Sequence, residues 1–508
     1  MSVVAQAVTP FNGPGVGWFA LSPLLVLVGA ALFLLVAGAL TPTWWRGLYA
    51  FVTAVAAGTA GVLAVVLWDD ISDRGPATLV GGALALDTFA MFATIVVCVG
   101  LLLVAMVTSD VLHRAGNDGP EIYALYLVAA TGGIVMAAAN DLIVLFVGLE
   151  TLSLALYVLA ASDRRRAASA ESGLKYFVLG GFSSAFFLYG VALIYGVTGS
   201  TNISRIVEAF GDRLPIERND ALVLAGVALL LVGLAFKVAA APFHVWTPDV
   251  YQGAPTPVSS FMASVGKAAA FAAMLRVLLV ALPFYRDDWR PIVWILAVTS
   301  LVVGSFLAVV QTDVKRMLAY SSINHAGFLL VGVEAAAHRA GETDAGLGVS
   351  SVLVYLLAYS VLVIGSFAVV ALVARTTDGA TDLDAFRGLS RRRPALALAL
   401  TVLLVAQAGV PFTSGFVAKF GVIRAAVDEH SYVLAVVAMV SSVVAAFLYL
   451  RIMVAAWITE APDGELEREP IPFTTGVALI MCVGFTLFVG VVPGWLLDAA
   501  ERTTDFAR

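Results

Sequence analysis

The sequence predicts an all-α polytopic membrane protein with about 14 transmembrane helices. Of its 508 residues, 61% are hydrophobic and only 13% are charged, whereas a soluble protein carries roughly 25% charged residues. The apolar runs are long and continuous, unlike the roughly ten-residue alternating strands of a membrane barrel. A large soluble catalytic domain is therefore excluded. The net charge of −6 argues against a nucleic-acid partner, which would need clustered Lys and Arg.

The apolar runs are long enough to cross a bilayer, which takes about 20 residues per helix. In order they are 18–40, 47–68, 78–108, 121–139, 142–161, 172–198, 221–246, 257–283, 291–311, 317–333, 350–374, 395–427, 432–457 and 472–494. No Lys or Arg precedes Arg46, so the first run lacks the basic segment of a cleavable signal peptide. We expect it to be retained as a helix.

The loops between alternate runs differ in their content of basic residues, which predicts orientation. The odd-numbered loops are the richer set and include Arg164, Arg165, Arg166, Lys315, Arg316, Arg375, Arg391, Arg392 and Arg393. We assign these loops to the cytoplasm. Both termini are then predicted to lie on the outer side of the membrane.

Two runs contain a Pro-Phe pair close to a lysine. In the run 221–246 Lys237 precedes the pair, and in the run 395–427 Lys419 follows it. Transporters place interrupted helices at their transport sites, and an interruption at this depth needs protein or water around it. The two runs are therefore predicted to be broken helices.

The interruptions are expected near Pro242 and Pro411. Proline has no backbone N–H and frees the carbonyl four residues earlier. The carbonyls of Val238 and Gln407 are therefore expected to be free for polar contacts beside the two lysines.

Lysine is scarce in this chain and concentrated inside the apolar runs. Four of the five lysines, Lys175, Lys237, Lys267 and Lys419, lie in runs, whereas the 24 arginines serve mainly the surface. Arginine stays protonated, but a buried lysine can lose its proton. A lysine at mid-membrane costs roughly 2.5–3.5 kcal/mol. Because such a cost must be offset or used, proton transfer is the favoured interpretation of these lysines. For Lys175, near the start of its run, reaching the headgroups is an equal alternative.

Carboxylates and histidines inside the runs add candidate proton-transfer groups. Glu150 is the expected counter-ion, because an opposite charge within about 4–6 Å stabilises a protonated lysine. The role of Asp87 is left open between function and structure. His244 and His325 can each accept and donate a proton near neutral pH, although a histidine hydrogen bond between packed helices is the alternative. His325 lies in the polar stretch 320–325, which suits a hydrated relay.

No cofactor or metal site is expected in this chain. The two cysteines, Cys98 and Cys482, lie in apolar runs, where a thiol behaves as a small hydrophobe. There is no dinucleotide fingerprint, and the one Gly-Lys pair, at Gly266 and Lys267, lacks the rest of a phosphate loop. The energy for transport is therefore expected to come from partner subunits or an ion gradient.

Five segments between positions 141 and 420 resemble the antiporter-like membrane subunits of the proton-pumping NADH:quinone oxidoreductase, respiratory complex I. They are DLIVLFVGLETLSLALYVL, LKYFVLGGFSSAFFLYG, FKVAAAPFHVWTPDVYQGAPTPVSSFMASVGKAAAF, KRMLAYSSINHAGFLLVG and GVPFTSGFVAKF. The stretch WTPDVYQGAPTP is the most specific. A lysine rather than a glutamate at position 419, the wording TPDVYQGAP and the lack of a long C-terminal extension are most similar to the subunit N branch of this family.

The resemblance implies an organisation of the chain. It implies a three-helix N-terminal segment at 1–120, two inverted five-helix repeats at 121–283 and 291–457, and a C-terminal helix at 458–508. Glu150 and Lys237 are implied to form a charge pair, with Lys267 as the central lysine and Lys419 as the terminal proton carrier.

The implied function is proton translocation through buried Lys and Glu residues, coupled to electron transfer from NADH to quinone in other subunits. The proton-transfer residues are then Glu150, Lys175, Lys237, His244, Lys267, His325 and Lys419. FMN and iron–sulfur clusters are implied for partner subunits. The implied partners are the other membrane and peripheral subunits of complex I, in a bacterial inner (plasma) membrane. The alternatives are a subunit of a stand-alone cation/proton antiporter complex, a solute symporter, or a passive structural subunit.

Overall fold

The computed structural model describes residues 15–41, 47–115, 119–211, 220–342, 346–375, 380–460, 470–503 and 506–507. The first elements are α1 (Ser22–Leu40), α2 (Leu48–Arg74), β1 (Ala77–Leu79), β2 (Leu84–Leu86) and α3 (Thr88–Ala115). They are followed by α4 (Pro120–Ala138), α5 (Leu142–Ala160), α6 (Ala167–Thr198), α7 (Ile203–Gly211), α8 (Asp220–Lys237), α9 (Trp246–Gly253), α10 (Thr256–Phe261), the π-helix η1 (Met262–Gly266), α11 (Lys267–Leu275) and the π-helix η2 (Arg276–Ala281).

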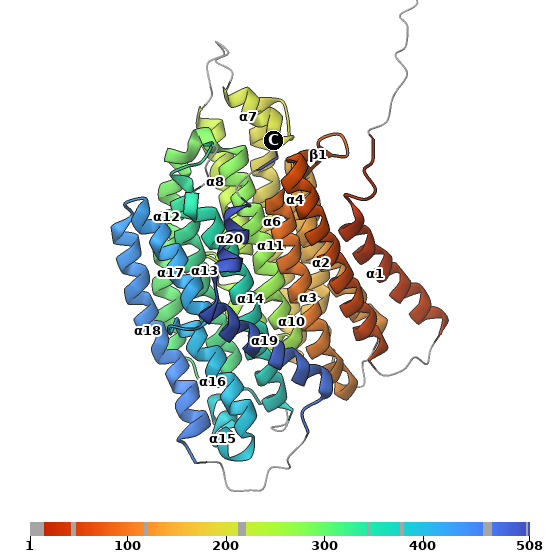
Figure 1. The fold of residues 1–508 in the computed structure, drawn as a ribbon, viewed down its shortest axis with the longest axis vertical. Coiled ribbons are helices and arrows are strands. Elements are labelled where there is room, and N and C mark those ends of the chain that lie inside the picture. The colour runs from red at the N-terminus through yellow and green to blue at the C-terminus, as the bar shows by residue number, and fades with distance from the viewer. Residues whose placement is uncertain are drawn as a thin grey trace, which may run out of the picture.

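The second half of the chain continues with the short 3₁₀ helix η3 (Pro283–Tyr285), α12 (Arg286–Val309), α13 (Val314–Ala337), α14 (Gly346–Ala374), the 3₁₀ helix η4 (Leu383–Phe386), α15 (Leu389–Arg392), α16 (Pro394–Ala408), α17 (Ser414–Asp428), α18 (Tyr432–Trp457), α19 (Phe473–Val491) and α20 (Gly494–Glu501). The long helices lie side by side in one bundle, with α7 at one end and α15 at the other (Figure 1).

Twelve helices in the described part of the chain are long and apolar enough to cross a membrane, which confirms the predicted polytopic helical fold. Two of the predicted apolar runs have no counterpart among these twelve helices. The run 317–333 lies in α13, which carries charged residues near both ends, and the run 395–427 is divided between α16 and α17. A count of 14 spans therefore stays a prediction.

The centre of the bundle is formed by two helices that are buried on all sides. The continuous segment α10–η1–α11–η2 and the helix α14 contact each other and are almost wholly buried, whereas α1 and α18 lie at the edges of the bundle (Figure 1). A helix that is hydrophobic all round is expected to occupy such a position. Lys267 is therefore carried by the most central helix of the fold.

A similar Asp-capped helix start, with a threonine partner, occurs in both predicted repeats. The Asp141 carboxylate caps α5 through the backbone N–H groups of Ile143 and Val144, and it accepts a 2.8 Å hydrogen bond from the Thr201 hydroxyl. The Asp313 carboxylate caps α13 and accepts a 2.6 Å hydrogen bond from the Thr381 hydroxyl. The recurrence agrees with an internal duplication, but the segment boundaries 1–120, 121–283, 291–457 and 458–508 stay predictions.

The two Pro-Phe interruptions break their helices as predicted. Helix α8 ends at Lys237 and α9 begins at Trp246, while α16 ends at Ala408 and α17 begins at Ser414. Each break contains a non-glycine residue with positive φ, Ala239 at 60° and Phe412 at 65°. Such a backbone costs about 1–3 kcal/mol and persists only where the surroundings impose it.

The carbonyls that make polar contacts at the breaks differ from those predicted. The indole N–H of Trp246 donates to the Phe236 carbonyl, and the Thr299 hydroxyl donates to the Ala241 carbonyl. At the second break the Ala408 carbonyl accepts from two side chains. The helices unwind before the prolines, so the accepting carbonyls lie at the helix ends and not four residues before each proline.

Candidate functional site: buried lysines along the bundle

Lys237 ends α8 at the first break. It is buried, and its Nζ donates a 2.6 Å hydrogen bond to the Ser153 hydroxyl of α5. The rings of Tyr157 and Tyr176 lie 5.5 and 5.7 Å from Nζ, a range in which aromatic faces attract a cation. The amine is therefore held by a neutral hydroxyl and aromatic rings.

Glu150 lies three residues before Ser153 on α5 and is half-buried. Its Oε1 accepts a hydrogen bond from the Ser184 hydroxyl of α6. Among the described residues, no ion pair within 4.0 Å joins Glu150 to Lys237, although the two charges attract each other over a longer distance. The predicted charge pair is thus an indirect one, because Ser153 occupies the position next to the amine.

Lys267 lies at the centre of the bundle, directly after the π-helix η1. Its Nζ donates a 2.5 Å hydrogen bond to the Ser322 carbonyl of α13 and lies 5.7 Å from the centre of the Tyr359 ring. π-Bulges of this kind occur frequently at functional sites. Lys267 is therefore deeply buried, with a backbone carbonyl as its partner, and its role as the central lysine stays a prediction.

His325 joins two tyrosine hydroxyls in the interior of the bundle. Its Nδ1 lies 2.7 Å from the Tyr355 hydroxyl and its Nε2 lies 3.1 Å from the Tyr449 hydroxyl. The Tyr449 hydroxyl in turn lies 2.7 Å from the Ser321 hydroxyl. The polar stretch of α13 is therefore part of a hydrogen-bonded network.

Lys419 lies on α17, just after the second break. Its Nζ donates to the Ala408 carbonyl at 3.1 Å and to the Ser442 hydroxyl at 2.8 Å. The Phe328 ring centre lies 4.7 Å away. Lys419 thus resembles Lys237 in being held by a neutral hydroxyl and an aromatic ring beside a helix break.

Lys175 does not belong to this buried set. Its side chain is 42% exposed, and Nζ forms ion pairs with Glu171 at 2.7 Å and Asp249 at 2.8 Å. Asp249 is shared with Arg316 at 2.7 Å. The expectation that Lys175 is buried is wrong, because this part of α6 lies at the surface of the bundle, as the alternative for this lysine had it. A role for Lys175 in proton transfer stays a prediction.

His244 lies in the first break but is only half-buried, and it joins none of these contacts. Its Nδ1 has no hydrogen-bond partner among the described residues. The structure therefore brings His325, and not His244, into the buried network.

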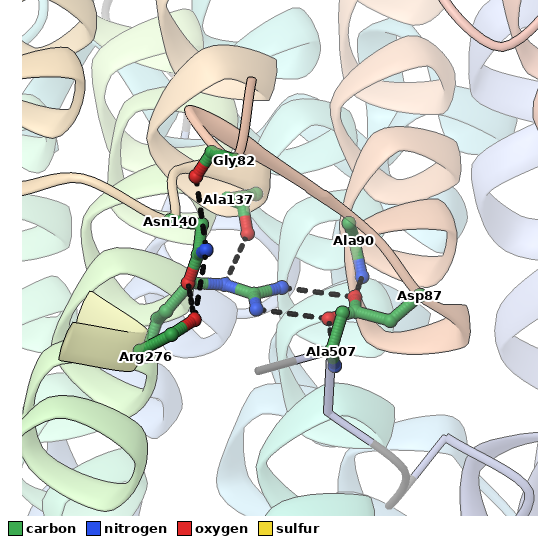
Figure 2. Close-up of polar contacts among 8 residues, drawn as sticks. Gly82, Asp87, Ala90, Ala137, Asn140, Arg276 and Ala507 are labelled. Atoms are coloured by element: carbon green, nitrogen blue, oxygen red, sulfur yellow. Dashed lines mark hydrogen bonds and ion pairs between the residues drawn. The ribbon is translucent and has the colours of Figure 1, made fainter. Parts of the chain in front are cut away.

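Asp87 forms a buried ion pair with Arg276, which is a structural contact. Figure 2 shows the Arg276 guanidinium facing both carboxylate oxygens, at 2.8 and 2.9 Å. The same carboxylate accepts from the backbone N–H groups of Ala90 and Ala507, and Arg276 also donates to the Ala137 carbonyl. Asp87 therefore connects α3, η2 and the C-terminal residues.

Three buried charged residues were not predicted. Lys315 was assigned to a cytoplasmic loop but is 1% exposed, because the segment joining α9 to α10 covers it. Arg276 lies inside the apolar run 257–283, which is the signal that identifies it. Glu334 is also buried and lies one residue beyond the run 317–333. Within the described part of the chain, no group of three or more His, Cys, Asp or Glu side chains is arranged to hold a metal ion.

Comparison with known proteins places the chain in a family. A family model described as "NADH:quinone oxidoreductase/Mrp antiporter, TM" matches residues 139–445. NADH-quinone oxidoreductase subunit N 3 of Streptomyces griseus is 41% identical and is aligned over 98% of this chain and 96% of its own length. NADH-quinone oxidoreductase subunit N of Mycobacterium tuberculosis is 40% identical over 97% of this chain and 99% of its own length.

Among solved structures, a chain of respiratory complex I from Thermus thermophilus superposes with a TM-score of 0.77 at 32% identity. The match covers 95% of this chain and 100% of the other. Sequence and structure therefore agree along almost the entire length. The chain belongs to the membrane-subunit family of NADH:quinone oxidoreductases and Mrp antiporters, within its subunit N branch.

Proposed function

We propose that this chain is a proton-translocating membrane subunit of a NADH:quinone oxidoreductase and that its buried lysines carry the protons. The carrying observation is that Lys237, Lys267 and Lys419 are buried, while no ion pair within 4.0 Å holds any of them among the described residues. A fixed positive charge is costly in such surroundings. An amine that exchanges its proton is compatible with these surroundings, because its neutral form still donates hydrogen bonds to the same oxygen atoms.

The proposed order of transfer follows the geometry across the bundle. Glu150 favours the charged form of Lys237, and a shift that weakens this attraction releases the proton towards Lys267. The His325 network, with the hydroxyls of Tyr355 and Tyr449, lies on the way to Lys419. Imidazole and hydroxyl groups both accept and donate protons, as a relay requires.

The energy for transport comes from outside this chain. Moving one charge against 100 mV costs about 2.3 kcal/mol, so a static row of lysines cannot pump. We assign the redox chemistry, with FMN and iron–sulfur clusters, to partner subunits that oxidise NADH and reduce quinone. This chain then acts as a non-redox subunit of a bacterial inner membrane complex, with the α15 end on the cytoplasmic side and both termini outside.

The test uses inverted membrane vesicles that carry the whole complex with Lys267→Met. We expect NADH:quinone turnover and proton uptake to fall at least fivefold, while NADH oxidation by a soluble electron acceptor is retained. Arg387→Met, at an exposed surface pair with Asp384, is the matched control and should behave as the unmodified complex. Full pumping in Lys267→Met vesicles would refute the proposed relay.

A stand-alone cation/proton antiporter subunit is the second candidate, since the matching family model also covers Mrp antiporters. Gentle solubilisation of the native membrane and separation by size distinguishes the two. Co-migration of this chain with NADH-oxidising activity supports the oxidoreductase. Migration in a smaller assembly, with sodium-linked proton exchange in vesicles lacking NADH, supports the antiporter.

A further inference from the structure

Lys315 is a buried lysine in the first turn of α13 that the relay described above does not use. It is 1% exposed, and its Nζ donates a 2.5 Å hydrogen bond to the Ala254 carbonyl. No carboxylate within 4.0 Å pairs with it among the described residues. The positive end of a helix dipole also disfavours a cation at a helix start. Lys315 therefore occupies a position where a permanent charge is costly.

A charged cleft lies beside Lys315 at the α15 end of the bundle. Its volume is about 360 Å³, and its lining includes Glu171, Lys175, Asp249 and Asp313. Asp313 and another lining residue, Arg166, both interact electrostatically with Lys315. Gly253, which also lines the cleft, directly precedes Ala254, whose carbonyl accepts the hydrogen bond from Lys315 Nζ. The lysine thus lies immediately behind a surface that is open to solution.

The interior side of Lys315 leads towards Lys267. Ser322 is seven residues further along α13, which places it on the same helix face, about 10 Å deeper. Its carbonyl accepts the hydrogen bond that Lys267 Nζ donates. Tyr251, three residues before Ala254, has its hydroxyl near that of Ser322, and so has Tyr359.

The polar groups around Ser322 suit a chain of water molecules. The hydroxyls of Ser322 and Tyr359 are buried and have no hydrogen-bond partner among the described residues. Buried polar groups are nearly always satisfied by protein or by ordered water, and a water between them needs two to four polar partners. The hydroxyls of Ser322, Tyr251 and Tyr359 supply such partners beside the Ser322 carbonyl that binds Lys267.

We infer that Lys315 is the group through which protons pass between the solution at the α15 end and the central lysine, Lys267. The inference rests on the proposed proton-translocating function and adds the point of access to it. A proton from the cleft binds to the Nζ of Lys315, and the neutral amine is restored when that proton moves along the hydroxyls near Ser322 to Lys267. Nζ can donate to the Ala254 carbonyl in both states.

The alternative is that Lys315 only holds α13 against the segment joining α9 to α10. A structural lysine of this kind is replaceable by arginine, which keeps the charge and donates to a carbonyl but does not release its proton. A proton-exchanging lysine is instead replaceable by histidine, which titrates near neutral pH. The two substitutions therefore separate the roles.

The experiment measures NADH:quinone turnover and proton uptake in inverted vesicles carrying the intact complex. We expect Lys315→Met and Lys315→Arg each to lower both rates at least fivefold, and Lys315→His to retain at least half. Arg387→Met is the control at the same end of the bundle. Wild-type rates in Lys315→Arg, or in Lys315→Met, would overturn the inference.

Two further variants keep the test decisive. If Lys315→Met fails to assemble, Ser322→Ala decides. Ser305→Ala is its control because, among the described residues, that buried hydroxyl bonds only to carbonyls of its own helix. A threefold or larger loss in Ser322→Ala supports the route, and unchanged rates overturn it. Lys267→Met reports separately on the proposed function. If Lys267→Met is inactive while Lys315→Met is active, the access route through Lys315 is refuted and the proposed function is not.

Discussion

Removal of the Asp87 carboxylate is expected to destabilise the folded chain strongly. Asp87 and Arg276 have exposed side-chain fractions of 0% and 1%, so Asp87→Ala leaves the Arg276 guanidinium buried without its charge partner. Breaking a buried pair in this way costs about 3–5 kcal/mol. The carboxylate also accepts from the Ala90 N–H in the first turn of α3, and loss of such a cap adds about 1 kcal/mol.

The measurement is the free energy of unfolding of the purified chain in mixed micelles, with the amount of folded chain in the membrane as a second readout. Asp70→Ala is the matched control, because Asp70 pairs with Arg74 at exposed fractions of 38% and 77% and an exposed pair contributes about 0–1 kcal/mol. The double variant Asp87→Leu with Arg276→Met should recover much of the loss, since apolar replacements of a buried pair are often neutral. A loss for Asp87→Ala no larger than that for Asp70→Ala would refute the reasoning.

Two further substitutions test the second break and the histidine network. Gly415→Ala places a methyl group 1.8 Å from a backbone oxygen of α16, so we expect loss of folded chain in the membrane. Gly484→Ala is the control and should be tolerated, because its methyl group meets nothing within 4 Å. Equal yields of the two variants would contradict the predicted clash. Tyr355→Phe removes the hydroxyl that lies 2.7 Å from His325 Nδ1 and should lower NADH:quinone turnover severalfold. Tyr432→Phe, at an exposed tyrosine, is the control and should leave the rate unchanged. Identical rates in the two variants would exclude the Tyr355 hydroxyl from the relay.

The lysines illustrate how far the sequence predicts the site. Lys237, Lys267 and Lys419 lie well inside apolar runs, and each is buried as predicted. Lys175 and Lys315 both lie near the ends of helices, where the run itself does not determine burial. The first is at the surface because its partners Glu171 and Asp249 lie there. The second is covered by a segment some sixty residues earlier in the chain.

The charge pairs show the same limit. Glu150 and Asp87 stand out in the sequence because both lie in apolar runs, but their partners come from distant segments. Asp87 pairs with Arg276, and Glu150 accepts from Ser184 and not directly from Lys237. Pairing depends on which helix faces pack together, and helical periodicity alone does not specify it.

The sequence by itself determined the helical membrane fold, the two interrupted helices and the family, because apolar run length, proline and a long specific motif are properties of local sequence. Only the tertiary structure decided which charges are buried together. It placed Lys315 behind a polar cleft and Lys175 at the surface, and it paired Asp87 with Arg276 (Figure 2). The physical reason is that the electrostatic cost of a charge depends on everything packed around it, and those neighbours come from helices far apart in the chain.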